Sequence, residues 1–385
     1  MNTSFNTDKF KDIPTPFYYY DMDLLRETLH ALNEAAAQHP SFVVHYAMKA
    51  NANPALLKVI SGAGLGADCV SGWEVSAACA GGFAPTNIVF AGVGKTDGEI
   101  ATALKAGIGC FNVESLEELA VINDIAAQTG TTARIAFRVN PNVDAHTLAK
   151  ITTGLAENKF GISTDSVEHA IRTAEVMHNV KFAGLHFHIG SQITSTKPFA
   201  ALCHVINKLQ DTLEKDGISV PTINVGGGLG VDYGQPDNNP IPDFKGYFAA
   251  YAETLETRPG QTVHFELGRS VVAQCGSLIT RALYIKHGKA KTFAIVDAGM
   301  NDLIRPALYQ AVHKIENISS TAEENTYDVV GPICESSDVF AKDITLPATK
   351  RGDLLAIRSA GAYGEVMASQ YNCRPLAKSY TSDAL

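Results

Sequence analysis

The residues most able to do chemistry in this chain stand directly after short apolar segments. Lys49 follows the apolar run at residues 42–48 and precedes a turn-forming stretch at residues 51–54. A lysine in such a place is usually a solvated loop charge, yet its amine can also act as a nucleophile in an active site. Polar residues or glycines end further apolar segments in the same way: Asp68, Lys95, Glu114, Asn140, His188 with Ser191, Gly226–Gly228, and Glu266 with Arg269.

These apolar segments alternate with amphipathic helical stretches from about residue 42 to residue 268, which indicates repeated βα units. Each segment is short and mostly apolar on both faces, as a parallel sheet covered by helices requires. The predicted strands are Val43–Met48, Ala67–Val70, Asn87–Gly92, Cys110–Glu114, Arg134–Asn140, Gly184–Gly190, Ile223–Gly228 and Val263–Gly268. They predict an α/β fold built on a (β/α)8 barrel of the TIM type, with a doubly wound open sheet as the alternative.

The barrel prediction can be checked against the positions of the polar residues. Active sites of such barrels lie at the carboxyl ends of the strands. The polar residues named above stand at those ends, from Lys49 after the first strand to Glu266 at the last. Any single polar strand end is weak evidence because loops are wet, but a polar group or glycine at every end favours one shared site.

After Arg269 the pattern changes to longer strand-like segments without long helices between them. These segments are Gly276–Lys286, Thr292–Asp297, Tyr327–Gly331 and Asp353–Arg358. They predict a β-rich domain, either a sandwich or a small barrel, that also takes up the strand-like run Pro16–Tyr20. We therefore expect an N-terminal segment at residues 1–27 that joins the β domain, a barrel at residues 28–270, and the β-rich domain at residues 271–385.

Composition narrows the class of protein. The net charge of −9 and the lack of a basic stripe argue against a nucleic-acid partner. No apolar run approaches the ~20 residues that a membrane helix needs, and residues 1–9 lack the apolar core of a secretory signal, so we expect no membrane association. The seven cysteines are scattered without a Cys-x-x-Cys pair, which favours a reducing cytoplasm over a disulfide framework.

Two motifs point to the chemistry of a ligand. The consecutive glycines Gly226–Gly228 can present backbone N–H groups to an anion, and barrels commonly bind phosphate at the loops after strands seven and eight; a simple tight turn is the alternative. Glu266 ends the last predicted strand, where its carboxylate can point into the barrel mouth. A buried carboxylate needs a partner, which is either Arg269 or a protonated ring nitrogen. Beside a phosphate site, the second possibility suggests a phosphorylated pyridine.

The histidines of the sixth predicted strand allow two interpretations. His186 and His188 share one face of that strand and could bind a metal, but a third ligand at suitable spacing is not evident, so we predict no metal. We expect the flat imidazole of His188 to stack on a cofactor ring. His186 is expected to be a hydrogen-bonded core residue.

In this order the motifs resemble those of the alanine-racemase-type (fold type III) pyridoxal-phosphate decarboxylases. The resemblance covers nearly the whole chain and rests on residues 46–51, 188–192, 226–228 and 266–269, although Leu267 stands where the family usually has proline. It implies pyridoxal 5'-phosphate as the cofactor, held covalently by the catalytic Lys49, with His188 stacked on its ring and Glu266 paired with its ring nitrogen. The resemblance also places the following residues at the cofactor: Ser191, Gly228, Gly268, Arg269 and Tyr363.

The β-rich part of the chain is most similar to family members that decarboxylate meso-diaminopimelate to L-lysine in the last step of lysine biosynthesis. Residues 331–338 match a loop of these enzymes whose cysteine, here Cys334, is a general acid that reaches the active site of the other subunit of a homodimer. By composition alone Cys334 would be a buried structural thiol. The resemblance puts Arg269, Arg305 and Tyr309 at the distal carboxylate of the substrate, Glu335 at its distal ammonium group, and Tyr363 at both cofactor and substrate.

The chemistry of the substrate agrees with this assignment. Diaminopimelate carries a carboxylate and an amine at each end, so its site needs cationic groups and an acid at the far end, and arginine suits planar carboxylates. Ornithine has only an amine there, and a site for it would gain nothing from Arg305. One alternative is a decarboxylase of ornithine, arginine or a carboxylated polyamine, against which Arg305 and the cysteine loop argue. The other is a pyridoxal-phosphate-binding protein without catalysis; such proteins tend to lack the lysine, the cysteine loop or the second domain, all of which this chain keeps.

Overall fold

The computed structural model describes residue 5, residues 7–143 and residues 159–385. The described residues divide into two compact units. We call the first the barrel unit; it comprises Leu29–Gly230 and Asp243–Gly268. The second, which we call the β unit, comprises the chain up to Thr28, Val231–Pro242 and Arg269–Leu385.

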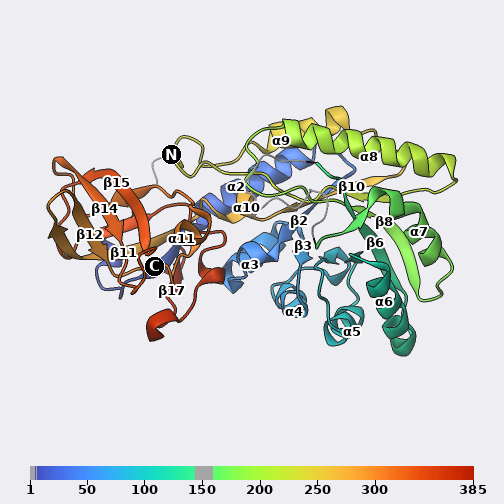
Figure 1. The fold of residues 1–385 in the computed structure, drawn as a ribbon, viewed down its shortest axis with the longest axis horizontal. Helices are drawn as coiled ribbons and strands as arrows, with labels where there is room; N and C mark the ends of the chain where they lie inside the picture. Colours follow the sequence, from blue (N-terminus) through green and yellow to red (C-terminus); the bar gives the residue numbers. More distant parts are fainter. Residues whose placement is uncertain (1–4, 6, 144–158) are drawn as a thin grey trace. The chain divides into compact units, whose positions relative to one another are not determined.

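The barrel unit is built on a closed parallel sheet (Figure 1). Its strands are β2 (Phe42–Ala47), β3 (Gly66–Cys69), β4 (Ile88–Phe90), β5 (Cys110–Val113), β6 (Ala133–Asn140), β8 (Val180–His186), β9 (Thr222–Asn224) and β10 (Thr262–Leu267). Each strand pairs in parallel with the next, and β10 pairs with β2, which closes the sheet. The short β7 (Ile162–Ser163) pairs with β6 beside the barrel. Closure confirms the predicted (β/α)8 barrel and excludes the open sheet.

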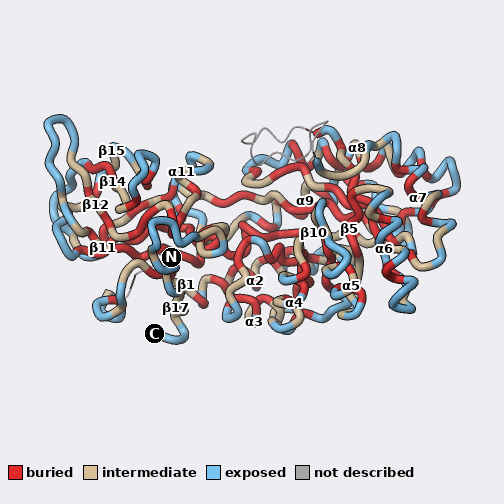
Figure 2. Tube along the Cα trace, turned by 60° about the horizontal axis from the view of Figure 1, so that its bottom comes forward, coloured by how far each residue is buried: buried red, intermediate tan, exposed pale blue. Residues whose placement is uncertain are grey.

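Helices follow the strands and cover the sheet. They are α3 (Pro54–Gly62), α4 (Gly72–Ala80), α5 (Asp97–Ala106), α6 (Leu116–Thr129), α7 (Val167–Glu175), α8 (Lys197–Lys215) and α9 (Phe244–Thr254), with α2 (Met22–Ala36) before β2 and short turns η1 (Met48–Ala50), η2 (Pro85–Asn87) and η3 (Thr164–Ser166). Local signals set their ends: Thr96 and Glu99 form a reciprocal capping box at the start of α5, and Gly107 ends it in the left-handed conformation. Figure 2 shows β5 and β10 as buried, while α6 and α7 present exposed residues on their outer sides.

The β unit contains a mixed sheet in the order β13-β16-β11-β12-β14-β15. Its strands are β1 (Phe17–Tyr20), β11 (Gly276–His287), β12 (Thr292–Val296), β13 (Ile315–Asn317), β14 (Glu324–Val330), β15 (Val339–Pro347), β16 (Leu354–Ile357) and β17 (Lys378–Thr381). Its short helical segments are α1 (Thr7–Phe10), α10 (Arg269–Val272), α11 (Arg305–Tyr309), η4 (Glu365–Met367) and η5 (Tyr371–Cys373). As predicted, the N-terminal strand joins this sheet, because β1 pairs with β11.

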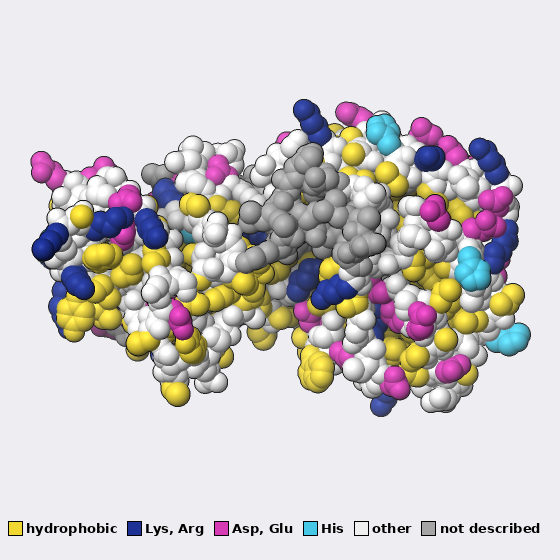
Figure 3. Space-filling view, viewed as in Figure 1, with side chains coloured by type: hydrophobic (Ala, Val, Ile, Leu, Met, Phe, Trp, Pro, Cys, Tyr) yellow, Lys and Arg dark blue, Asp and Glu magenta, His cyan; other side chains and the backbone are white. Residues whose placement is uncertain are grey.

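Acidic and basic side chains are interspersed over the face drawn in Figure 3, with hydrophobic side chains between them. In the part of the chain that the structure describes, no helix is both long and apolar enough to span a bilayer.

Candidate active site

A cavity of about 390 Å³ opens in the barrel unit, beside the carboxyl ends of the barrel strands. Ionisable side chains contribute much of its wall: Lys49, Asp68, Arg138, Lys159, His186, His188 and Glu266. Of the residues predicted to hold a cofactor, the cavity thus brings together Lys49, His188 and Glu266.

Lys49 lies on η1, directly after β2, with its amine beside a buried acid. Its Nζ is 3.9 Å from Oδ2 of Asp68, and the Lys49 side chain is 40% exposed whereas that of Asp68 is 1% exposed. Burial and the neighbouring Glu266 raise the pKa of Asp68 well above its usual range, and neither Asp68 oxygen accepts a hydrogen bond from the described residues. The amine therefore combines access to the cavity with a neighbour that can carry a proton.

Glu266, at the end of β10, is held from three sides. Its Oε2 is 3.1 Å from Nε2 of His186, and its Oε1 accepts hydrogen bonds from Nδ2 of Asn224 at 2.7 Å and of Asn112 at 3.3 Å. Burial acts to raise the pKa of Glu266, but the charge and hydrogen bond of His186 and the charge of Lys49 outweigh it and hold the pKa below its ordinary value. An oriented carboxylate anion thus lies in the wall of the cavity.

Asn224 also connects this carboxylate to the glycine loop. Its Oδ1 accepts a hydrogen bond from the backbone N–H of Gly226 at 2.9 Å, which orients the amide so that Nδ2 faces Glu266. The backbone N–H of Glu266 in turn donates to the carbonyl of Gly226 at 2.8 Å. One asparagine therefore sets where the carboxylate lies relative to Gly226–Gly228. The sequence analysis missed both Asn112 and Asn224, although each stands in or at the end of a predicted strand.

The glycine loop has no room for side chains. Gly226 and Gly228 have φ angles of +70° and +110°, a region that L side chains rarely adopt. A Cβ at Gly227 would lie 1.9 Å from the carbonyl oxygen of Glu266. The loop's N–H groups include that of Gly227, which donates to Nδ1 of His188 at 3.3 Å.

His188 lies just after β8 and stays neutral. Burial, together with the charges of Lys49 and Arg138, lowers its pKa well below the ordinary value, so Nδ1 can accept the N–H of Gly227 while the other ring nitrogen carries the proton. Ser191 follows on the same loop, before α8. Gly268 is tightly confined, since a Cβ there would lie 3.0 Å from the Cβ atoms of Ala47 and Ala50.

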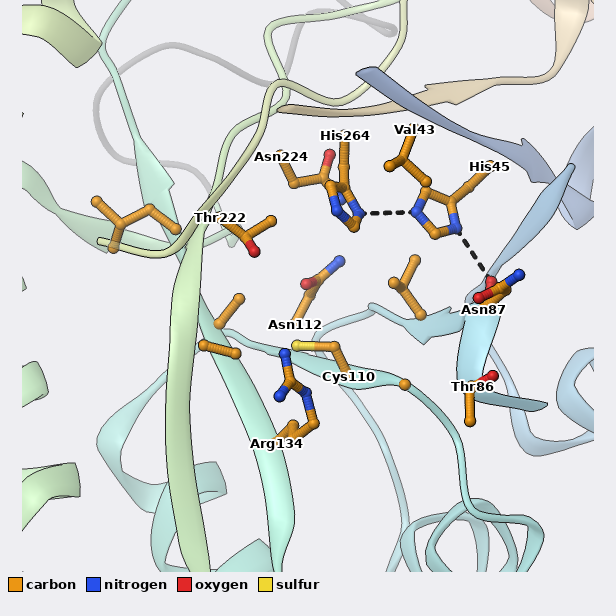
Figure 4. A pocket seen from close by; sticks show the side chains of 15 residues that line it. Val43, His45, Thr86, Asn87, Cys110, Asn112, Arg134, Thr222, Asn224 and His264 are labelled. Carbon is orange, nitrogen blue, oxygen red and sulfur yellow. Dashed lines mark hydrogen bonds between the residues drawn. The ribbon is translucent and has the colours of Figure 1, made fainter. Parts of the chain in front are cut away.

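A second cavity, of about 210 Å³, is lined by Asn112 and Asn224 among other residues (Figure 4). Barrel interiors are usually filled by bulky branched side chains. Here Nε2 of His45 is instead 2.8 Å from Nδ1 of His264, and Nδ1 of His45 is 3.1 Å from the carbonyl of Asn87. Burial lowers the pKa of both rings, that of His264 to about 3. Two neutral histidine rings thus lie in this cavity, together with the guanidinium of Arg134.

In the β unit, two arginines predicted to bind substrate gather around one tyrosine. Nη1 of Arg269, at the start of α10, donates to the hydroxyl of Tyr233 at 2.5 Å, and its guanidinium lies 4.8 Å from the ring centroid of Tyr363. The guanidinium of Arg305, at the start of α11, lies 4.9 Å from the ring centroid of Tyr233. Tyr309 ends the same helix. The sequence analysis missed Tyr233, because this residue is neutral and lies in a loop that no pattern marks.

Arg305 is a buried cation without a carboxylate partner in the described part of the chain. It is 5% exposed, and burial lowers its pKa. The groups that favour its charge are the tyrosines Tyr233, Tyr363 and Tyr309. A buried charge is normally paired, so this guanidinium is suited to receive an anion from outside the chain.

Cys334 and Glu335 lie on the loop between β14 and β15. Cys334 is exposed rather than buried, contrary to what composition alone would indicate. Its backbone N–H donates to Oδ1 of Asn372 at 3.1 Å, and the hydroxyl of Tyr371 donates to Oε1 of Glu335. The two residues therefore stand together on a loop held by the segment around η5.

Comparisons with known proteins agree with this geometry. Residues 25–273 match the family model described as pyridoxal-dependent decarboxylase, pyridoxal binding domain. The chain is 62% identical over 385 residues, the full length of both proteins, to a diaminopimelate decarboxylase of Bacteroides thetaiotaomicron. A diaminopimelate decarboxylase from Helicobacter pylori, solved with L-lysine, superposes with a TM-score of 0.91 at 42% identity over 97% of this chain and 93% of that one. One from M. jannaschii, also with L-lysine, gives 0.90 at 37% identity over 98% and 89%.

Proposed function

Because the chain belongs to the pyridoxal-dependent decarboxylase family, we propose that it uses pyridoxal 5'-phosphate to remove CO2 from meso-diaminopimelate, giving L-lysine in the last step of lysine biosynthesis. It is a carbon-carbon lyase of the carboxy-lyase type. The full-length similarity to the relative from Bacteroides thetaiotaomicron carries the choice of reaction. The buried Arg305, which has no carboxylate partner among the described residues, supports a substrate with a second carboxylate.

The residues of the barrel unit fit the cofactor. Glu266 is a buried anion that can accept the N–H of a pyridinium nitrogen and so keep that nitrogen protonated. The loop Gly226–Gly228 carries no side chains, so its backbone can come close to a phosphate. When bound, pyridoxal phosphate supplies an electron sink for the electron pair left by departing CO2.

The chain's own groups divide the remaining work. In the proposal, Lys49 holds the cofactor through Nζ between turnovers, and the neutral His188 lies against its ring face. Ser191, Gly228, Gly268, Arg269 and Tyr363 complete the cofactor contacts. Cys334 donates a proton from Sγ to the carbon that has lost CO2.

Recognition of the far end of the substrate falls to the β unit. We assign its distal carboxylate to Arg269 and Arg305 with Tyr309, since arginine forks match a planar carboxylate. Glu335 would bind the distal ammonium group, and Tyr363 would contact substrate as well as cofactor. Because both arginines are buried, an ionic interaction between them and the substrate carboxylate contributes more binding energy here than it would at the surface.

The proposal includes a homodimer in which Cys334 of one subunit serves the active site of the other. The exposed position of Cys334 supports this role. It also includes a cytoplasmic location, which the seven free cysteines favour. Analytical ultracentrifugation tests the dimer. Mixing inactive Lys49→Ala and Cys334→Ala subunits tests the sharing, because mixed dimers would regain one complete site.

Product identification tests the reaction itself. The protein is incubated with pyridoxal phosphate and, in separate tubes, meso-diaminopimelate, ornithine and arginine, and the products are identified by mass spectrometry. Lysine from the first tube alone supports the proposal. A diamine or agmatine would keep the cofactor and the fold but replace the substrate. No product in any tube would favour a non-catalytic cofactor-binding protein.

A further inference from the structure

We propose that His313 is a positioning residue for the proposed reaction: it orients Arg305 as a neutral hydrogen-bond acceptor and so leaves the guanidinium charge for the substrate carboxylate. The inference rests on the proposed role of Arg305 in substrate binding. His313 itself is not expected to touch the substrate.

The hydrogen bonds define the tautomer of His313. Its Nδ1 is 2.8 Å from the carbonyl oxygen of Arg358, which can only accept, so Nδ1 carries the proton. Its Nε2 therefore has a free lone pair, and Nε of Arg305 donates to it at 3.3 Å. A protonated imidazole could not accept this bond, so the geometry requires a neutral ring.

The surroundings keep the ring neutral and fixed. His313 is 3% exposed, and burial together with the neighbouring Arg305 lowers its pKa to about 3. The ring of Tyr233 packs edge-on against it, with 5.0 Å between the ring centroids. Tyr233 thus contacts the imidazole of His313 as well as the guanidinium of Arg305.

The nearby carboxylates are engaged by other cations. Asp237 forms ion pairs with Lys314 at 2.7 Å and with Arg358 at 3.0 Å. Glu316 forms pairs with the same two cations at 2.7 and 2.6 Å. This network holds the backbone whose carbonyl fixes His313, and its acids are satisfied without Arg305.

The choice of a neutral acceptor has a functional reason. An internal carboxylate beside Arg305 would also orient the guanidinium, but it would neutralise the charge and compete with the substrate. An imidazole supplies direction without competition. A leucine could not accept the hydrogen bond and so would not orient the guanidinium. A glutamine would place a neutral oxygen near the position of Nε2.

The test compares three variants of the holoenzyme: His313→Gln, His313→Leu and His313→Glu, with Arg305→Met as the reference. For meso-diaminopimelate we expect KM to change less than about 3-fold in His313→Gln, to rise about 10-fold in His313→Leu and to rise further in His313→Glu, with kcat within about 3-fold of the original. The inhibition constant of L-lysine should rise in parallel, because lysine retains the distal carboxylate. The affinity for pyridoxal phosphate should be unchanged, which separates positioning from a general loss of structure.

The outcomes distinguish the inference from the function it rests on. If Arg305→Met raises KM but His313→Leu does not, the positioning role of His313 is wrong and the substrate-binding role of Arg305 stands. If neither variant raises KM, Arg305 does not bind the distal carboxylate, and both proposals fall. His313→Gln and His313→Leu differ little in size from histidine, so they decide the question even if the buried glutamate of His313→Glu prevents folding.

Discussion

The hydrogen bonds of Asn224 lead to a prediction that separates cofactor binding from stability. Replacing Asn224 by leucine removes the 2.7 Å bond to Glu266 and the 2.9 Å bond from Gly226. A hydrogen bond to a charged group contributes about 1.5–3 kcal/mol, and one between neutral groups about 0.5–1.5 kcal/mol. Glu266 would keep His186, the longer contact from Asn112 and the backbone hydrogen bond to Gly226, but its carboxylate would lose the side-chain link to the glycine loop.

We expect this loss to appear in cofactor affinity. If about half of the charge-assisted bond energy served to aim the carboxylate, the dissociation constant of pyridoxal phosphate would rise about 4- to 13-fold, since 1.4 kcal/mol is tenfold in a binding constant. Equilibrium dialysis of the cofactor-free protein against pyridoxal phosphate measures this directly. Urea unfolding of the cofactor-free protein should show a free energy of unfolding lower by about 2–4.5 kcal/mol.

Asn207 on α8 provides a matched control. It has the same two-ended arrangement, donating through Nδ2 to the carbonyl of Thr254 at 2.9 Å and accepting the N–H of Glu256 at 3.0 Å. Asn207→Leu should therefore reduce stability by about 1–3 kcal/mol without changing cofactor affinity. The reasoning is refuted if Asn224→Leu binds pyridoxal phosphate as tightly as the original protein, or if Asn207→Leu weakens binding equally.

Three further predictions follow from the site and from the buried histidines. Lys49→Ala should abolish turnover and release the cofactor on gel filtration; a variant that kept both would remove Lys49 from its role. Cys334→Ala should reduce kcat by at least about 100-fold while pyridoxal phosphate stays bound, and full activity would exclude the thiol as the proton donor. His264 and His313 have pKa values lowered from 6.5 to about 3 in the fold. The unfolded chain therefore binds more protons between these values, so the free energy of unfolding should decrease as pH falls below 6.5, by up to about 1.4 kcal/mol per pH unit for each histidine. Urea titrations at pH 7 and pH 5 would contradict this if their midpoints coincided.

The barrel could be predicted from the sequence because its strands are short, apolar and regularly spaced. Every predicted barrel strand overlaps an observed one, although β9 ends at Asn224, before the glycines that the prediction included. In the β unit, the prediction missed β13, β15 and β17. These strands are short or half exposed, with burial alternating irregularly along β15, so neither an apolar run nor a clean alternation marks them. Segment 231–242 groups with the β unit because of contacts that no local pattern records.

Only some of the residues of the candidate site could be predicted from the sequence. Lys49, His188 and Glu266 could be found because charged or aromatic groups at strand ends have a positional meaning in a barrel. Asn112, Asn224, Tyr233 and His313 could not. Each is neutral, and most act through a partner far along the chain: Asn112 and Glu266, for example, are 154 residues apart. Pairing of this kind arises only from the closed sheet and the folded loops.

The neutral residues that the sequence did not reveal distinguish two uses of charge in this molecule. Lys95 and Glu118 form an internal pair at 2.6 Å, with side chains 1% and 12% exposed, and each charge is satisfied by the other. Arg305 is instead oriented by the neutral imidazole of His313. Glu266 is oriented by the amides of Asn112 and Asn224, and also by His186, whose charge lowers the pKa of this carboxyl. An orienting group without charge leaves the ionic interaction available to a ligand of opposite sign. The buried charge of Arg305, held by a neutral partner, therefore indicates a binding role, whereas the Lys95–Glu118 pair indicates a structural one.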